Sequence, residues 1–261
     1  MTIGVGGSTA EAELAALTTM RGDAPAIGVA ERQRRTERAQ ALMREQGIDA
    51  LWLDVSTSLT YFTGLRLGRS ERLHGAVLPA KGDLTYLCPA FEEAKLRTML
   101  TLGDDVAVWE EHEDPAALVT DTLRAKGLAS GTVGVDEACP FFTFDGLRRA
   151  GNAYDFVAAS AITAACRSVK SDAEIALMQT AKNITLEAHK AAARIMREGI
   201  TTTEVQAFLV EAHLRLGSEG PPPFNIVLFG EATAYPHGVP YPQTLQDGRR
   251  GAAAGQQLHR L

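Results

Sequence analysis

The stretch "SDAEIALMQTAKNITLEAHKAAARI", residues 171–195, separates two kinds of sequence. Ser171 followed by Glu174 is a capping box, which marks the beginning of a helix. Apolar residues then recur every three or four positions, which predicts one buried helix face. That face consists of Ile175, Met178, Ala181, Ile184, Ala188, Ala191 and Ile195. We therefore expect a domain boundary shortly before this helix, between residues 163 and 164.

Upstream of this helix, short apolar runs alternate with helical patterns. This alternation predicts an α/β domain with a mixed sheet over residues 30–163. Strand-length apolar runs occupy residues 48–55, 105–111, 131–137 and 154–160, and residues 75–89 read as a hairpin. Helical patterns occupy residues 31–46, 91–100, 114–127 and 142–151.

Residues 1–29 are rich in Gly, Ala and Thr, with a short helical pattern near Leu14 and Leu17, and are expected to form a flexible N-terminal arm. The cluster Gly4-Val5-Gly6-Gly7 follows no strand and opens no helix. It therefore lacks the setting of a phosphate-binding loop.

Downstream, Thr201 and Glu204 form a second capping box, and "FNIVLFG", residues 224–230, reads as a strand. Residues 164–248 therefore resemble the first half of a second domain. Residues 249–261 consist mainly of Arg, Gly, Ala and Gln and form an aberrant tail. The tail has no apolar period, so we expect it to be disordered or loosely helical. The strand edge and the apolar faces around Ile184 and Phe208 should then be exposed.

Composition narrows the functional classes. A net charge of −6 gives no broad basic surface for nucleic acid. No apolar run approaches the ~18 residues of a membrane span. Three widely separated cysteines fit neither a disulfide framework nor a zinc motif, which favours a reducing cytoplasm.

His237 is the candidate site residue. Pro236 restricts the backbone before it, and Gly238 permits close approach of a ligand or another chain segment. It also follows the 224–230 strand by a few residues, where loops often carry site residues. These residues alone leave two interpretations open, a functional histidine and an ordinary loop histidine.

Three segments in order carry a family resemblance: "MREQGIDALWLDVSTSLTYFTG" (43–64), "CRSVKSDAEIALMQTAKNIT" (166–185) and "FNIVLFGEATAYPHG" (224–238). Together they resemble the pita-bread metallopeptidases, in the branch of Xaa-Pro dipeptidase (prolidase) and aminopeptidase P. The resemblance implies a creatinase-like N-terminal α/β domain followed by an incomplete α+β pita-bread catalytic domain.

The resemblance also implies a chemistry. Such enzymes hydrolyse the peptide bond before proline with water activated by two divalent metal ions, manganese or cobalt. The position of His237 binds the substrate carbonyl or the tetrahedral intermediate. Tyr61 is expected to lie near the substrate cleft, or else to be a half-buried tyrosine at a strand end. The resemblance further implies a homodimer and a prolyl dipeptide or short peptide as substrate.

The family's metal ligands are two Asp, one His and two Glu, and all follow the loop that contains His237. No residue of this chain matches them, so we expect no metal ligand, no cofactor and no peptidase activity in the chain as given. The alternative is a catalytically dead binding or dimerisation module of the same fold.

The genetic code permits an explanation for the tail. Codons for Arg249–Leu261 can be chosen that, read one base later, encode Asp-Val-Val-Leu-Leu-Leu-Asp-Asn-Ser-Cys-Thr-Gly. That is the apolar strand and the first metal-binding Asp that the family would have here. We therefore expect the tail to be the product of a frameshift after Gly248.

Overall fold

The computed structural model describes residues 3–246 and 251–256. They form two compact units. The sheet unit is Ile27–Lys170, and the helical unit combines Met1–Ala26 with Ser171–Leu261. The boundary lies after Lys170 rather than at residue 163, because the helix Ser160–Arg167 continues past that point and its Cys166 is buried in the core of the sheet unit.

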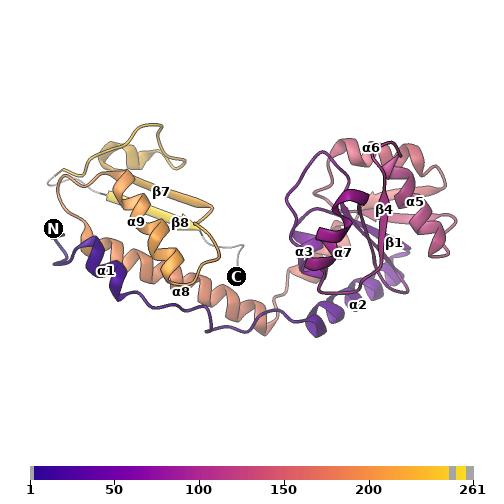
Figure 1. Ribbon diagram of the computed structural model, residues 1–261, viewed down its shortest axis with the longest axis horizontal. Helices are drawn as coiled ribbons and strands as arrows, with labels where there is room; N and C mark the ends of the chain where they lie inside the picture. The colour runs from indigo at the N-terminus through magenta and orange to yellow at the C-terminus, as the bar shows by residue number, and fades with distance from the viewer. Residues whose placement is uncertain (1–2, 247–250, 257–261) are drawn as a thin grey trace. The chain divides into compact units, whose positions relative to one another are not determined.

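The sheet unit is built on six strands in the order β4-β3-β2-β1-β5-β6. The central strand β1 and the edge strand β4 are labelled in Figure 1. Neighbouring strands are antiparallel in the pairs β1–β2 and β2–β3 and parallel in the other three pairs. This mixed sheet confirms the expected α/β class. The strands are β1 (Ala50–Asp54), β2 (Gly75–Pro79), β3 (Thr85–Pro89), β4 (Val106–Trp109), β5 (Gly131–Val135) and β6 (Tyr154–Ala158).

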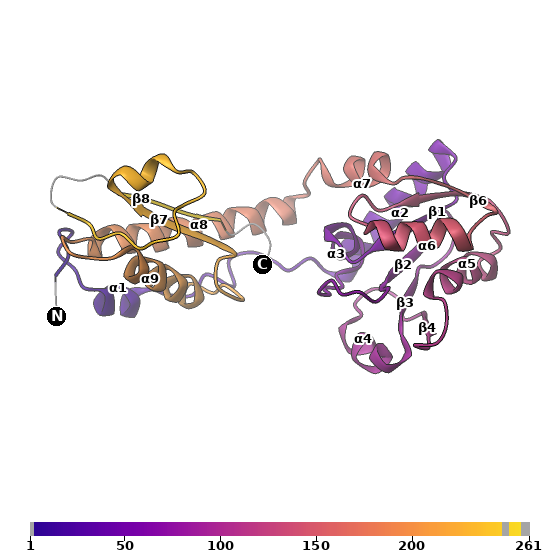
Figure 2. The same cartoon turned by 90° about the horizontal axis from the view of Figure 1, so that it is seen from above.

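Helices cover both faces of this sheet. One face packs against α2, α3, α4 and α7, and the other against α5 and α6 (Figure 2). The central strand β1 serves both cores, because Leu51 and Leu53 enter one and Trp52 enters the other. The helices are α2 (Val29–Gln46), α3 (Thr57–Thr63), α4 (Glu93–Met99), α5 (Pro115–Ala125), α6 (Phe141–Ala150) and α7 (Ser160–Arg167), with a 3-10 turn at Ala90–Glu92.

The helical unit packs two helices against a two-stranded antiparallel sheet. Both helices begin with the expected capping boxes, at Ser171 and at Thr201. A short helix from the N-terminal segment contacts them both (Figure 1). The elements are α1 (Ala10–Ala16), α8 (Asp172–Ile195), α9 (Thr202–Arg215), β7 (Phe224–Phe229), a 3-10 segment (Gly230–Ala234) and β8 (Gly251–Gln256).

The expected buried face of α8 is wrong at its beginning. Ile175 and Met178 are 53% and 44% exposed, and burial on this helix starts at Thr180. The reason is length, because α8 has 24 residues whereas its partner α9 has 14. The first turns of α8 therefore extend beyond the helix that buries the rest.

The flexible N-terminal arm expected for residues 1–29 takes a different form. Residues 10–16 form α1, with Thr9 as its N-cap. The side chains of Leu14, Leu17 and Met20 pack against the core of the helical unit. A short helical pattern near Leu14 and Leu17 is visible in the sequence, but the packing of the segment is not, because its partners lie far along the chain.

The tail also differs from expectation. Residues 251–256 form β8, which pairs antiparallel with β7; the rest of the tail lies outside the described residues. A strand ladder uses backbone groups, so a run of Ala and Gly can supply it without any side-chain period. Ile184 and Phe208, expected to be exposed, are buried.

Within the described residues, no helix is long and apolar enough to cross a membrane.

Candidate functional site

His237 lies on a loop that leaves the buried end of β7. Val227 and Phe229 are buried, so the strand is fixed in the core of the helical unit. Gly238 has a φ of +84°, and its N–H donates to the carbonyl of Tyr235 at 3.0 Å. This left-handed step turns the chain at His237, whose side chain is exposed.

The far end of this loop is held by the segment that connects α8 to α9. The Gly199 N–H donates to the carbonyl of Leu245 at 2.8 Å, and the Leu245 N–H donates to the carbonyl of Ile200 at 2.9 Å. Thr202 and Gln243 exchange two further hydrogen bonds, of 2.9 and 3.1 Å. The loop is therefore anchored at both ends, and His237 lies between the anchors.

Sequence reasoning did not identify these anchors. A second contact reinforces them, because the Gln243 side-chain oxygen accepts a hydrogen bond from the Phe229 N–H at 3.3 Å. Thr202 could have been noticed only as one of three consecutive threonines, and nothing local links it to Gln243.

Tyr61 belongs to the helix α3 rather than to a strand end. Its hydroxyl donates to the carbonyl of Cys166 at 2.8 Å, and the Arg35 guanidinium lies 4.1 Å from its ring centroid. These contacts connect α3, α7 and α2 within the sheet unit. They give Tyr61 a packing role, and a position near substrate stays a prediction.

The described residues do not fit the metal pair that the family resemblance implies. Among residues 3–246 and 251–256, no group of three or more His, Cys, Asp or Glu side chains is placed to hold a metal ion. One exposed imidazole at His237 cannot replace the several carboxylates that hard divalent cations require. What His237 can do from this loop is exchange a hydrogen bond with an oxygen atom of a bound ligand.

Two buried carboxyl groups lie at the ends of neighbouring parallel strands, and the sequence analysis did not single them out. Asp54 ends β1, and Asp136 follows β5 directly. The Trp52 indole donates to Asp54 at 3.3 Å, and the Ser56 hydroxyl donates to Asp136 at 2.6 Å. Burial raises the pKa of both carboxyl groups above the ordinary value. Their positions directly after apolar strands were the available signal.

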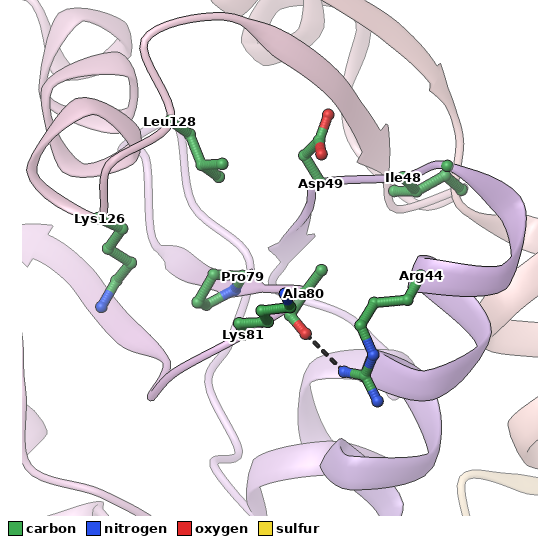
Figure 3. Close-up of a pocket in the computed structure, with 9 residues that line it drawn as sticks. Arg44, Ile48, Asp49, Pro79, Ala80, Lys81, Lys126 and Leu128 are labelled. Carbon is green, nitrogen blue, oxygen red and sulfur yellow. Dashed lines mark hydrogen bonds between the residues drawn. The ribbon is translucent and has the colours of Figure 1, made fainter.

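A cavity of about 530 Å³ opens at another part of the sheet unit (Figure 3). Arg44 and Lys126 are its best-fixed cations, and each donates to a backbone carbonyl, of Ala80 at 2.7 Å and of Asp83 at 2.8 Å. Both lie at C-terminal helix ends, where positive charge offsets the helix dipole. The lining is Arg44, Gly47, Ile48, Asp49, Pro79, Ala80, Lys81, Lys126 and Leu128. The helix dipoles and these two carbonyl contacts account for the fixed charges, and we assign the cavity no ligand.

Two family models match the chain. The creatinase/prolidase N-terminal domain matches residues 35–169, and metallopeptidase family M24 matches residues 176–249. The first match lies within the sheet unit and the second within the helical unit.

Known proteins agree with these matches. The putative dipeptidase YkvY of Bacillus subtilis is 26% identical over 215 residues, which cover 82% of this chain and 59% of that protein. The crystal structure of dipeptidase PepE from Mycobacterium ulcerans is 28% identical, with a TM-score of 0.79, and the match covers 88% of this chain and 62% of that one. A prolidase structure from Thermococcus sibiricus, 21% identical, shares the fold with a TM-score of 0.76. The chain therefore spans about three fifths of these relatives, and the resemblance seen in the sequence is confirmed.

Proposed function

The chain belongs to the creatinase/prolidase N-terminal domain family, and on that premise we propose that it carries the first part of an Xaa-Pro dipeptidase. Such an enzyme hydrolyses the bond before proline in a dipeptide or short peptide. The metallopeptidase match over residues 176–249 and the dipeptidase relatives support this proposal. Because those relatives are longer, the activity of a complete protein is part of the proposal.

His237 is the residue that we propose for substrate binding. The observation that carries this role is an exposed imidazole on a loop anchored at both ends. A fixed N–H donor aimed at a substrate oxygen stabilises the negative charge that develops there during hydrolysis. Loss of one such donor typically lowers kcat by about 10²–10³-fold. We also propose a position near the substrate for Tyr61.

The proposal assigns no metal to this chain. In the proposed family chemistry, two divalent ions, manganese or cobalt, activate the attacking water. The described residues do not supply a set of ligands for them. We therefore propose that the 261-residue chain hydrolyses no prolyl dipeptide.

A comparison of two reading frames tests this proposal. The gene as given would be expressed beside a version with one base deleted at codon 248, and both proteins would be assayed with Ala-Pro and added manganese. We expect hydrolysis only from the shifted frame, and in it His237→Ala should reduce kcat by about 10²–10³-fold. Hydrolysis by the unaltered chain would contradict our account of the metal ligands. A stop codon soon after the deletion would reject the frameshift.

In that last outcome, a non-catalytic binding or dimerisation module takes the place of the peptidase. The favouring observation is a complete sheet unit in a chain whose described residues hold no group of metal ligands. Sedimentation of the unaltered chain distinguishes a dimer from a monomer. A cytoplasmic location belongs to the same proposal and is supported by three free thiols, at Cys88, Cys139 and Cys166.

A further inference from the structure

The N-terminal segment, residues 3–26, binds the helical unit at both ends of the α8–α9 pair. The first contact is at the C-terminal end of α8. There the Val5 N–H donates to the carbonyl of Met196, the C-cap residue of α8, at 2.7 Å. The last carbonyls of a helix have no partner within the helix, so this donor supplies one.

This contact at the end of α8 requires glycine. A Cβ atom built on Gly4 would lie 2.3 Å from the backbone oxygen of Arg194. On Gly6 it would lie 2.5 Å from the Arg194 Cα. Both contacts are with backbone, which cannot rotate away as the end of a side chain can. The Gly-rich start of the chain is therefore fitted to the end of α8.

The second contact is at the C-terminal end of α9. The Met20 N–H donates to the carbonyl of Leu216, the C-cap residue of α9, at 2.9 Å. The Arg215 guanidinium donates to the carbonyl of Leu14 at 3.1 Å, which ties the same helix end to α1. Glu13, which lies between Val5 and Met20 in the sequence, forms an ion pair with Arg194 at 2.8 Å, and the Glu13 side chain is only 12% exposed.

The contact at the end of α8 is adjacent to the anchors of the His237 loop. Met196 accepts from the segment, and Gly199 and Ile200 bond to Leu245 of the loop. Leu245 and Leu14 pack against the same apolar core. The short connection between α8 and α9 therefore forms hydrogen bonds with both the N-terminal segment and the His237 loop.

We propose that residues 3–26 act as a strap that holds the α8–α9 connection, and through it the His237 loop, in position. When the strap is released, the connection loses a cap and the loop loses the rigidity of its anchor. Local openings of this kind have their own free energies, below that of global unfolding. The N-terminus of the chain thus controls the order of the loop. The functional meaning rests on the proposed role of His237, whereas the coupling itself does not.

Hydrogen exchange on the full-length chain tests the coupling. Gly4→Ala introduces the backbone clash, and Gly22→Ala is the matched control, because a Cβ there meets nothing within 4 Å. In Gly4→Ala we expect exchange about tenfold faster in residues 5–20, and also at the amides of Gly199, Ile200 and Leu245. Exchange in β1 of the sheet unit should stay unchanged, and Gly22→Ala should match the unaltered chain.

A second variant, Leu14→Glu, releases the strap by placing a charge at its apolar contact. Faster exchange in the strap alone, with the loop anchors unchanged in both variants, would overturn the proposal. An unchanged strap in both variants would overturn it too, because the contacts would then not hold the segment. Since no substrate is present, a failure of the peptidase assignment leaves this result intact.

Discussion

The sheet unit and the helical unit bury their apolar residues in different ways. The sheet unit places six strands between two layers of helices, and all of these elements come from one continuous segment, Ile27–Lys170. The helical unit has two strands, and it completes its core with Leu14, Leu17 and Met20 from the other end of the chain. The difference teaches that a core can be local in sequence in one unit and depend on distant residues in its neighbour.

The largest expected effect tests whether the two cores are independent. Trp52→Ala removes a fully buried side chain from the sheet unit and should cost about 3–5 kcal/mol. Phe208→Ala should cost a similar amount in the helical unit. Calorimetry should show each variant lowering a different transition. If both variants moved one common transition, the two units would fold as one.

A second prediction concerns pH and only the sheet unit. Burial raises the pKa of Asp54 and Asp136 above the ordinary 3.8, so ionisation costs more in the folded state than in the unfolded state. Their contribution to stability is therefore greatest at low pH and falls as the pH rises above 3.8 through the folded values. Denaturant unfolding from pH 4 to 8 should show this decline, and Asp54→Asn should flatten it. An equal slope in the variant would contradict the assignment.

The two capping boxes give a smaller effect in the helical unit. Ser171→Ala and Thr201→Ala should each destabilise it by about 1 kcal/mol, because each leaves helix N–H groups without a partner. Thr203→Ala, at an exposed neighbouring position, is the control. Urea unfolding monitored by circular dichroism measures the difference. Because Ala has a higher helix propensity than Thr, a control as damaging as the cap variants would contradict the assignment of the loss to capping.

The smallest expected effect is that of His237→Ala on stability. The side chain is exposed, so its removal should change the free energy of unfolding by less than about 0.5 kcal/mol. The melting temperature of the helical unit measures this directly. A loss as large as that of a cap variant would show that His237 supports the fold rather than a substrate.

The sequence was sufficient for the sheet unit because its signals are local. Runs such as residues 50–53 are apolar throughout, as expected of strands buried on both faces, and helix ends are marked by residues such as Asp114 and Gly127. The helical unit depends on partners that periodicity cannot reveal. Ile175 and Met178 continue the apolar spacing of α8, yet no local signal says that α9 is too short to cover them.

In the candidate site too, the features that depend on local sequence were predictable and those that depend on distant residues were not. The Pro236-His237-Gly238 step was visible because proline and glycine constrain the backbone wherever they occur. The bonds between Thr202 and Gln243 join residues with no shared pattern. The Gly-rich start of the chain was read as flexible because glycine permits both loose and closely packed backbone. Only the neighbouring end of α8 decides between these.

The strap has a consequence for synthesis on the ribosome. Residues 3–26 are synthesised before the sheet unit, but their binding surface on α8 and α9 is made only after it. At about 5–20 residues per second, the segment waits roughly 10–40 s without a partner. During that interval the sheet unit can fold, whereas Leu14 and its apolar neighbours remain accessible to chaperones and proteases. The strap therefore stays exposed to proteolysis until α9 has been synthesised.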